Sequence, residues 1–230
     1  MKAVILAAGV GYRLKMALPK ALAMVTNGKT ILDYQVEKLS KYVSASNICV
    51  VVGYKKETIM ETHPEVTYIV NEEYAECNTG KSLLKALNRI ESDDVLWLNG
   101  DVIFDERLIP RLITAKSSCV LVDNKKCGAE EVKYNSDSNG FIMGISKEVV
   151  SAEGEALGIN VVRRRELEIF KKHLTLVDRQ DYFEKAIENM IRQDGVKILP
   201  VNTDGLFCHE IDFLEDLENV RQYLSEAYRI

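Results

Sequence analysis

The sequence predicts an α/β protein built on a mostly parallel sheet with helices on both faces. Short apolar runs rich in β-branched residues predict buried strands at residues 4–7, 48–52, 66–70 and 95–98. Segments with helical spacing of apolar residues lie between these runs, and this alternation is typical of a parallel sheet covered on both sides. Ligands of such sheets bind at the carboxyl ends of the strands, and a loop with two glycines follows the first run directly.

The helices of the first half begin at polar residues. Apolar residues recur at helical spacing after Thr30, which can act as the N-cap. A second helix is predicted over residues 83–90, after the polar segment 78–82. Because parallel strands end at one edge of a sheet, we expect the loops that follow them to share that edge. These loops are residues 9–20, 71–82 and 99–101.

The pattern changes after about residue 117. We expect a single domain over residues 1–230, divided near this point into halves 1–117 and 118–230. Strands are predicted at residues 118–123, 129–134, 140–146 and 155–162, with a turn at 137–140. Two helices are predicted at 164–173 and 181–193, and a last helix at 213–227. Before that last helix, strands at 196–201 and 206–211 flank residues 202–205, which predict a hairpin turn.

Composition excludes several classes of partner. The chain has a net charge of −5 and no basic stripe, so we do not expect nucleic acid binding. The basic runs 163–165 and 171–172 fall on a predicted helix, where we expect a solvated face. The first residues form a predicted strand rather than a signal peptide, and no apolar run has the length of a membrane span. We therefore expect a cytoplasmic protein without a membrane partner.

The five cysteines show no C-x-x-C spacing and are odd in number, which favours a reduced protein over a disulfide framework or a zinc site. Cys49 and Cys119 lie in apolar strand patterns and are expected in the core.

The loop after the first strand suits a triphosphate. Gly9 and Gly11 allow backbone N–H groups to approach phosphate oxygens, and Arg13 and Lys20 add positive charge. The spacing is not that of a Walker A loop. It is not a dinucleotide fingerprint either, because Leu14 stands where the third glycine is needed.

Two acidic residues are candidate metal ligands. Asp101 follows the strand at 95–98 and Gly100, and Mg²⁺ in proteins is bound by one or two carboxylates together with substrate phosphates. Asp212 could complete this site, and strand alternation would point Glu210 the same way. The alternative for Asp212 is a helix capping box with Glu215. Glu210 is expected to be at the surface or to orient a neighbour.

Further polar residues follow the later strands. Asn78 and Gly80 stand at a predicted helix N-terminus that can contact a base or ribose, with simple helix capping as the alternative. Lys133 and Lys147 lie at strand ends and are candidates for an acceptor's phosphate, with a solvated position as the alternative. No convincing catalytic triad is present, and nucleotidyl transfer needs positioning and charge stabilisation more than a protein nucleophile.

The N-terminal loop resembles that of the nucleotidyltransferase (NDP-sugar pyrophosphorylase-like) superfamily. The resemblance rests on Leu6-Ala7-Ala8-Gly9-x-Gly11-x-Arg13-Leu14 followed by Pro19-Lys20-Ala21-Leu22. Most of the chain is similar to the short cytidylyltransferase branch, which includes CTP:phosphocholine and CTP:inositol-1-phosphate cytidylyltransferases. The other similar segments are 71–84, 99–101, 140–147, 155–160 and 210–212.

This resemblance implies a Rossmann-like, GT-A-like nucleotidyltransferase fold with a nucleotide-binding half before residue 117 and an acceptor-binding half after it. It implies Mg²⁺-dependent transfer of CMP from CTP to a small phosphorylated or phosphonate acceptor, and it leaves a homodimer open. The implied catalytic residues are Arg13 and Lys20, and the implied metal ligands are Asp101 and Asp212. The implied nucleotide-binding residues are Leu6, Ala7, Ala8, Gly9, Gly11, Asn78, Gly80, Ser82 and Asn99, and the implied acceptor-binding residues are Lys133, Lys147, Glu155 and Asn160.

Two alternatives stay open. One is a guanylyl-, uridylyl- or thymidylyltransferase acting on a sugar-1-phosphate. The loop between Arg13 and Pro19 is shorter than in many such enzymes and lacks Pro-x-Thr, which favours the cytidylyl branch. The other is a nucleotide-binding regulator without catalysis. The joint presence of two loop cations with Asp101 and Asp212 favours an enzyme.

Overall fold

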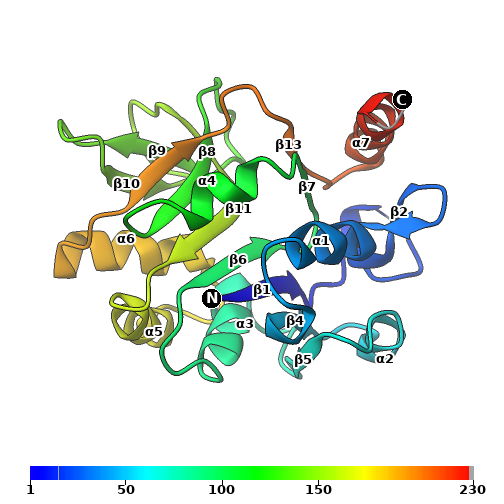
Figure 1. Ribbon diagram of the computed structural model, residues 1–230. Coiled ribbons are helices and arrows are strands. Elements are labelled where there is room, and N and C mark those ends of the chain that lie inside the picture. The colour runs from blue at the N-terminus through cyan, green and yellow to red at the C-terminus, as the bar shows by residue number, and fades with distance from the viewer. Residues whose placement is uncertain (15, 228–230) are drawn as a thin grey trace.

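The computed structural model describes residues 1–14 and 16–227. Within them a mixed sheet of nine strands runs through the molecule in the order β10-β9-β11-β6-β1-β4-β5, and β8 joins β11 and carries β12 (Figure 1). The α/β prediction is confirmed. The strands are β1 (Lys2–Ala7), β4 (Ile48–Val52), β5 (Thr67–Val70), β6 (Val95–Asn99), β8 (Cys119–Asp123), β9 (Lys133–Ser136), β10 (Ile142–Ser146), β11 (Gly154–Val162) and β12 (Leu199–Asn202).

The four strands that the first half contributes to the large sheet are parallel. β1 pairs with β4 on one side and β6 on the other, and β5 extends the sheet beyond β4. β1, β4 and β6 are buried along almost their whole length, which explains why their sequences are continuously apolar instead of alternating. The loops that follow β1 and β6 therefore leave the sheet at one edge, as the sequence predicts.

The second half adds antiparallel strands. β11 is antiparallel to β6 and to β8, so one sheet continues through both halves of the chain. β9 and β10 form the predicted hairpin, and Gly140 adopts a φ of 78° in its turn. Gly158 in β11 has a φ of 66°, at the place where the register between β11 and β8 shifts.

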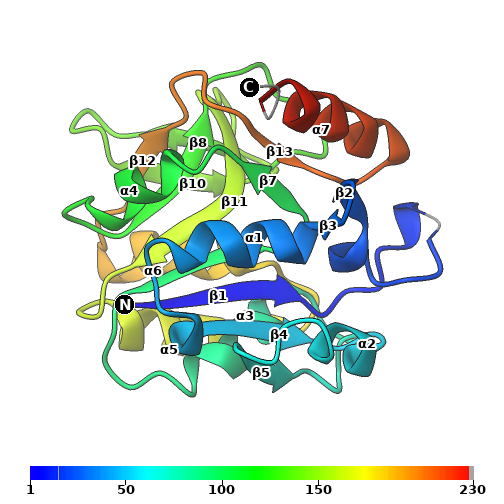
Figure 2. The same cartoon turned by 45° about the vertical axis from the view of Figure 1, so that its right-hand side comes forward.

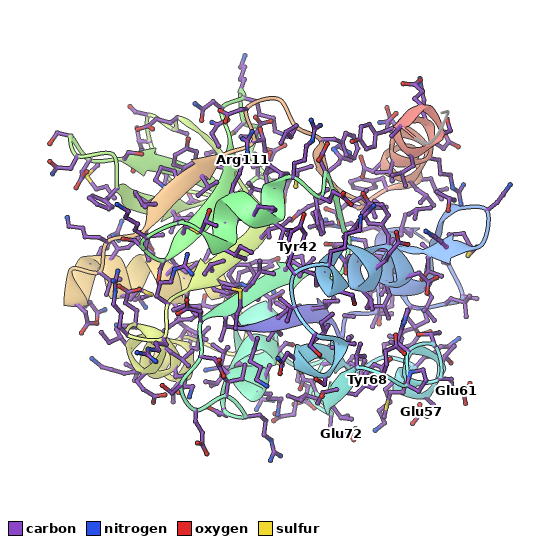
Figure 3. The ribbon with its side chains drawn as sticks, viewed as in Figure 1. Tyr42, Glu57, Glu61, Tyr68, Glu72 and Arg111 are labelled. Carbon is purple, nitrogen blue, oxygen red and sulfur yellow. The ribbon has the colours of Figure 1, made fainter. Side chains whose placement is uncertain are left out.

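The predicted hairpin at residues 202–205 is wrong. β12 pairs in parallel with β8, whereas β13 (Cys208–Glu210) pairs antiparallel with β7 (Val102–Phe104) in a separate small sheet. Arg111 on α4 (Leu108–Ile113) fixes the turn between them, because its guanidinium lies 2.7 Å from Asp204 Oδ2 and 3.4 Å from the Thr203 carbonyl oxygen (Figure 3). The turn residues were recognised correctly, but each flanking strand finds a partner elsewhere.

Helices cover both faces of the sheet. α1 (Ile31–Ser40), α2 (Lys56–Met60) and α4 pack on one face, and α3 (Thr79–Leu87), α5 (Leu167–Leu176) and α6 (Phe183–Asp194) pack on the other (Figure 2). The predicted cap of α1 is confirmed: Thr30 and Asp33 form a reciprocal capping box. Three short 3₁₀ turns complete the helices, at Tyr12–Leu14, Lys20–Leu22 and Ala45–Asn47.

The last helix packs back on the start of the chain. α7 (Leu214–Ala227) lies beside the hairpin of β2 (Met24–Thr26) and β3 (Lys29–Thr30), as Figures 1 and 2 show. Leu217, Val220 and Leu224 of α7 share a core cluster with Val25 and with Ile211. This cluster holds the segment before α7 close to the N-terminal loop.

The cysteines predicted in the core are buried, whereas one arginine predicted on a solvated face is buried as well. Cys49 and Cys119 are buried as predicted, and the five cysteines are free. The solvated-face prediction is wrong for Arg163, which precedes α5, is buried, and donates 3.1 Å hydrogen bonds to the carbonyl oxygens of Leu112 and Ile113. No helix among residues 1–14 and 16–227 has the length and apolar character required to cross a membrane.

Candidate active site

The glycine loop leaves the sheet from the end of β1. Gly100 donates a 2.9 Å hydrogen bond to the carbonyl oxygen of Leu6, and a Cβ at Gly100 would lie 2.5 Å from that oxygen. Gly11 has a φ of 68°, and a Cβ there would lie 2.7 Å from the Cβ of Lys20. Gly9 faces open space. The loop thus uses Gly11 to bring Lys20 close and leaves the backbone at Gly9 accessible.

Lys20 joins the two predicted metal ligands. Its ammonium nitrogen lies 2.7 Å from Asp101 Oδ2 and 2.8 Å from Asp212 Oδ1. Arg13 approaches the same group, with Nη1 3.1 Å from Asp212 Oδ2. The structure therefore brings together the four charged residues that the sequence singles out, from three distant parts of the chain.

The charges in this cluster shift the pKa values of Lys20 and Asp212 in opposite directions. Burial would lower the pKa of Lys20, but Asp101 and Asp212 outweigh this effect and raise it above its ordinary value. Burial would raise the pKa of Asp212, but Lys20 and Arg13 lower it below its ordinary value. The ion pair of Lys20 with Asp212 is therefore charged near neutral pH.

Backbone pairing positions the two acids. Ile211 donates a 3.0 Å hydrogen bond to the carbonyl oxygen of Asp101, next to the register in which β13 pairs with β7. The capping alternative for Asp212 is not what the structure contains, because its carboxylate accepts from Lys20 and Arg13. Asp216 instead accepts from the backbone nitrogens of Asp212 and Phe213. The carboxylate of Asp212 therefore does not cap the helix.

These residues fit a divalent cation that is shared with a substrate. Among the described residues no group of three or more His, Cys, Asp or Glu side chains could hold a metal alone. Mg²⁺ commonly uses one or two carboxylates and takes its other ligands from substrate phosphates and water. Asp101 Oδ1 is buried without a hydrogen-bond partner in the described part of the chain, and one ammonium already lies between the two carboxylates.

The loop before α3 is held by capping and by contacts with residues 179–181. Asn78 caps the helix, so the capping alternative holds for this residue. The space that Gly80 leaves is taken by the carbonyl oxygen of Asp181, 2.9 Å from where a Cβ would lie. The hydroxyl of Ser82 accepts a 2.9 Å hydrogen bond from buried Asn71. A nucleotide contact by these residues stays a prediction.

The predicted acceptor residues lie in or directly after strands of the second half. Lys133 donates a 2.7 Å hydrogen bond to the carbonyl oxygen of Lys147, and the Lys147 ammonium lies 3.2 Å from Glu130 Oε2. Glu155 has a largely buried side chain that pairs with Lys125 at 2.6 Å. Asn160 is buried, and its Nδ2 has no partner among the residues described. The two lysines and Glu155 are thus engaged by other residues of the second half, and a role of these four residues in acceptor binding stays a prediction.

Two further glutamates, Glu210 and Glu184, have side chains that the fold largely removes from solvent. Glu210 accepts a 3.1 Å hydrogen bond from Asn99 Nδ2, which agrees with an orienting role and not with a surface position. Burial and the charge of Asp101 raise the pKa of Glu210 well above its ordinary value. Glu184, in the first turn of α6, was missed, because its sequence context is that of an exposed helix residue. Its acidic side chain at a helix N-terminus is unremarkable until the fold buries it.

Comparison with known proteins gives one family match. The model of the MobA-like NTP transferase domain matches residues 3–196. A Bifunctional protein GlmU of Methanococcus maripaludis is 30% identical over 201 residues, which make up 82% of this chain and 47% of GlmU. This chain therefore spans about half the length of that relative. A CTP:phosphoglutamine cytidylyltransferase of Campylobacter jejuni is 26% identical, over 95% of this chain and 98% of that protein.

Solved structures share the fold. The CTP:phosphocholine cytidylyltransferase of Streptococcus pneumoniae superposes with a TM-score of 0.77 at 20% identity, over 97% of this chain and 98% of that one. The inositol-1-phosphate CTP transferase of T. maritima gives a TM-score of 0.77 at 18% identity, over 99% and 96% of the two chains. At these identities the likeness establishes the architecture alone.

Proposed function

Since the chain belongs to the family of MobA-like NTP transferase domains, and is thus a nucleotidyltransferase, we propose that it transfers CMP from CTP to a small phosphorylated or phosphonate acceptor and releases pyrophosphate. The observation that carries the proposal is the cluster of Lys20 with Asp101 and Asp212, beside the open backbone of Gly9. It combines positive charge for phosphates with two carboxylates at the edge of the sheet where ligands of α/β proteins bind.

The reaction is a substitution at the α-phosphorus. An oxygen of the acceptor's phosphate or phosphonate attacks that phosphorus and forms a new P–O bond. The bond from the α-phosphorus to the oxygen that bridges to the β-phosphorus breaks, and pyrophosphate leaves with the electron pair. Lys20 and Arg13 bind the triphosphate and stabilise the negative charge that develops on it. The nucleophile belongs to the acceptor, so no residue of the chain needs to be acylated or phosphorylated.

Asp101 and Asp212 are the residues that would hold Mg²⁺, which supplies charge neutralisation and alignment of the phosphates when bound. Asn99 precedes Asp101 by two residues and is expected near the nucleotide. Lys133, Lys147, Glu155 and Asn160 are expected on the acceptor's side.

CTP is favoured over other nucleotides by three lines of support. The loop between Arg13 and Pro19 is short, and proteins with the same fold act on CTP according to their names. A relative similar over nearly the whole chain is named CTP:phosphoglutamine cytidylyltransferase. The sugar-1-phosphate branch is the competing possibility, because a structure with a TM-score of 0.78 is described as a putative glucose-1-phosphate thymidylyltransferase.

Pyrophosphate release tests the proposal directly. The protein is incubated with Mg²⁺, one of CTP, UTP, GTP, dTTP or ATP, and one acceptor from a panel of phosphocholine, inositol-1-phosphate, 2-aminoethylphosphonate and sugar-1-phosphates. Release with CTP and one class of acceptor is expected. Release only with another nucleotide and a sugar-1-phosphate would move the protein to the sugar branch.

Replacing Asp101 by asparagine tests the role of the carboxylate. Asp101→Asn keeps the size of the side chain but removes a charge that can bind a cation. We expect a fall in turnover of about 10²-fold or more with little change in thermal stability. Near-normal turnover in this variant would contradict the metal assignment.

A further inference from the structure

A lysine between β4 and α2 has an unusual backbone conformation. Lys55 adopts a φ of 46° and a ψ of 43°, in the left-handed region that residues with a side chain seldom occupy. It also stands at the N-cap of α2, where Ser, Thr, Asp, Asn and Gly are preferred, and its side chain makes no capping hydrogen bond. Local preferences therefore favour glycine or asparagine at this position, and the reason for a lysine must come from elsewhere in the fold.

The side chain of Lys55 reaches the glycine loop. Its ammonium nitrogen donates a 2.5 Å hydrogen bond to the carbonyl oxygen of Ala17, 38 residues earlier in the chain. Ala17 comes three residues before Lys20, the lysine that contacts both predicted metal ligands. A residue that is unfavourable for its own backbone thus makes a long-range contact with the loop that we propose for the triphosphate.

Two hydrogen bonds that involve side chains join the described part of the segment 12–18 to other elements. One runs from Arg13 Nη1 to Asp212 Oδ2, at 3.1 Å, and the other runs from Lys55 to the carbonyl oxygen of Ala17. In the proposed function the first contact would change, because Arg13 turns to the triphosphate and Asp212 to Mg²⁺. The contact made by Lys55 includes neither of these residues, so it can hold the loop both before and after the nucleotide binds.

The backbone that carries Lys55 is itself fixed between the loops that follow β1 and β5. Tyr54 donates a 3.1 Å backbone hydrogen bond to the carbonyl oxygen of Ala8. The ring of Tyr54 lies 6.3 Å from the ring of Tyr74, and the Lys55 ammonium lies 5.6 Å from the centroid of the Tyr54 ring. A Cβ at Gly53 would lie 2.6 Å from the Cβ of Tyr74, so the glycine makes this packing possible. Lys55 therefore extends toward the loop from a firm base at the carboxyl edge of the sheet.

We propose that Lys55 is a positioning residue for nucleotide binding, which holds the glycine loop at Ala17 so that Gly9 and Lys20 are in place before the nucleotide arrives. This inference rests on the proposed function and adds a residue outside the segments that the sequence analysis singled out. A loop that is ordered in advance loses less conformational entropy on binding, so the nucleotide binds more tightly. The left-handed backbone at Lys55 is the local strain that this arrangement requires.

Two substitutions at Lys55 test the role of its ammonium group. Lys55→Met keeps most of the length of the side chain and removes the donor, whereas Lys55→Arg keeps a positive charge and N–H donors. We expect Lys55→Met to raise the KM for CTP about fivefold to tenfold while kcat stays within about twofold, and Lys55→Arg to keep this KM within about twofold of the parent value. Equal KM values for CTP in Lys55→Met and the parent protein would overturn the proposal.

A glycine at the same position separates function from stability. Lys55→Gly removes the ammonium and also the backbone strain, so we expect its Tm to equal or exceed that of the parent protein while its KM for CTP rises as in Lys55→Met. Ser151 is the matched control, because it is another residue with a side chain and a positive φ, of 57°. Ser151→Gly should also keep or raise the Tm, but its KM for CTP should stay within about twofold. An unchanged KM in Lys55→Gly, at any Tm, would overturn the proposal.

Hydrogen exchange separates this proposal from the proposed function, because it needs no turnover. Amide exchange is measured by mass spectrometry in the free parent protein and in Lys55→Met, and CTP binding is measured by calorimetry on both. We expect residues 9–20 to exchange about fivefold faster in Lys55→Met, with α6 unchanged.

If no pair of nucleotide and acceptor gives pyrophosphate, the proposed function fails, and faster exchange together with weaker CTP binding would still support the role of Lys55. Unchanged exchange over residues 9–20, or faster exchange with unchanged CTP affinity, would overturn that role even if CMP transfer is observed.

Discussion

Lys20 is the residue on which the candidate site depends most directly. A cation within hydrogen-bond distance of two carboxylates prevents them from repelling one another, and the same cation is needed by the phosphates of a nucleotide. In the proposed function, Mg²⁺ and the Lys20 ammonium would both contact Asp101 and Asp212. Lys20 and the metal would therefore compete for these two side chains until phosphates offer Lys20 another partner.

This competition predicts the behaviour of Lys20→Gln. In the absence of nucleotide, we expect the variant to bind Mn²⁺ about tenfold more tightly than the parent protein, as measured by electron paramagnetic resonance. Its kcat/KM for CTP should fall by about 10²-fold, because a phosphate contact is lost. Lys29→Gln is the control, since Lys29 pairs with Glu37 away from the two acids. Unchanged Mn²⁺ affinity in Lys20→Gln would show that the ammonium does not compete.

Glu184 makes stability depend on pH. Burial raises the pKa of Glu184 to about 7, so the folded protein holds a proton that the unfolded chain releases near the ordinary value of 4.5. This contribution is fully present below pH 4.5 and is lost as the pH rises through about 7. Between pH 5 and 8.5, the parent protein should lose on the order of 3 kcal/mol more unfolding free energy than Glu184→Gln, measured by urea denaturation with EDTA. If both proteins lose the same unfolding free energy between these pH values, Glu184 does not have a raised pKa in the folded state.

Single residues were predictable where their environment is local. Thr30 was predicted as a cap because the helical spacing of apolar residues begins directly after it, and Asp101 was predicted at the edge of the sheet because it follows a buried strand and Gly100. Arg163 and Glu184 could not be recognised, because their burial depends on segments far away in the sequence. The carbonyl oxygens that bind Arg163 lie some fifty residues earlier, and the lysine that faces Glu184 is on another hairpin.

Gly158 shows at the level of one strand how backbone conformation serves the site. Alanine would be strained at a φ of 66° and would collide with Asn99 and Glu210. We expect Gly158→Ala to lower the unfolding free energy by about 1–2 kcal/mol from strain, with a further loss from the displaced side chains, and to reduce CMP transfer. Gly140→Ala is a matched control, because Gly140 has a φ of 78° with nothing within 4 Å of a Cβ. Equal losses in both variants, with transfer unchanged, would show that the space beside Gly158 is irrelevant.

Most strands of the large sheet were predicted, and so was the hairpin of β9 and β10, but the partners of β12 and β13 were not. The four parallel strands follow from apolar runs that only a doubly covered sheet can bury. β12 and β13 looked like a hairpin because a turn sequence separates two short runs. Local sequence determines the turn and the strands, whereas pairing depends on which strands have a free edge. Here β12 pairs with β8, and β13 pairs with β7. For the same reason, the small sheet of β7 and β13, which positions Asp212, was not predicted.

On the scale of the molecule, the site depends on α7, a helix that carries none of the predicted site residues. α7 buries Leu217 in the cluster that also contains Ile211, the neighbour of Asp212. Leu217→Ala should lower the unfolding free energy by about 2–4 kcal/mol and make turnover fall at a lower temperature. Leu214→Ala is the control, since Leu214 is 56% exposed at the start of the same helix; its stability should change by less than about 0.5 kcal/mol. Similar stabilities of the two variants would contradict the anchoring role.

The contact of Asp212 with Lys20 also has a consequence for biosynthesis. A ribosome adds residues from the N-terminus onward, so Lys20 and Asp101 emerge well before Asp212. A nascent chain that already contains the glycine loop and the parallel strands still lacks one of the two carboxylates. Translation therefore leaves the cluster of Lys20, Asp101 and Asp212 incomplete until residue 212 has been synthesised.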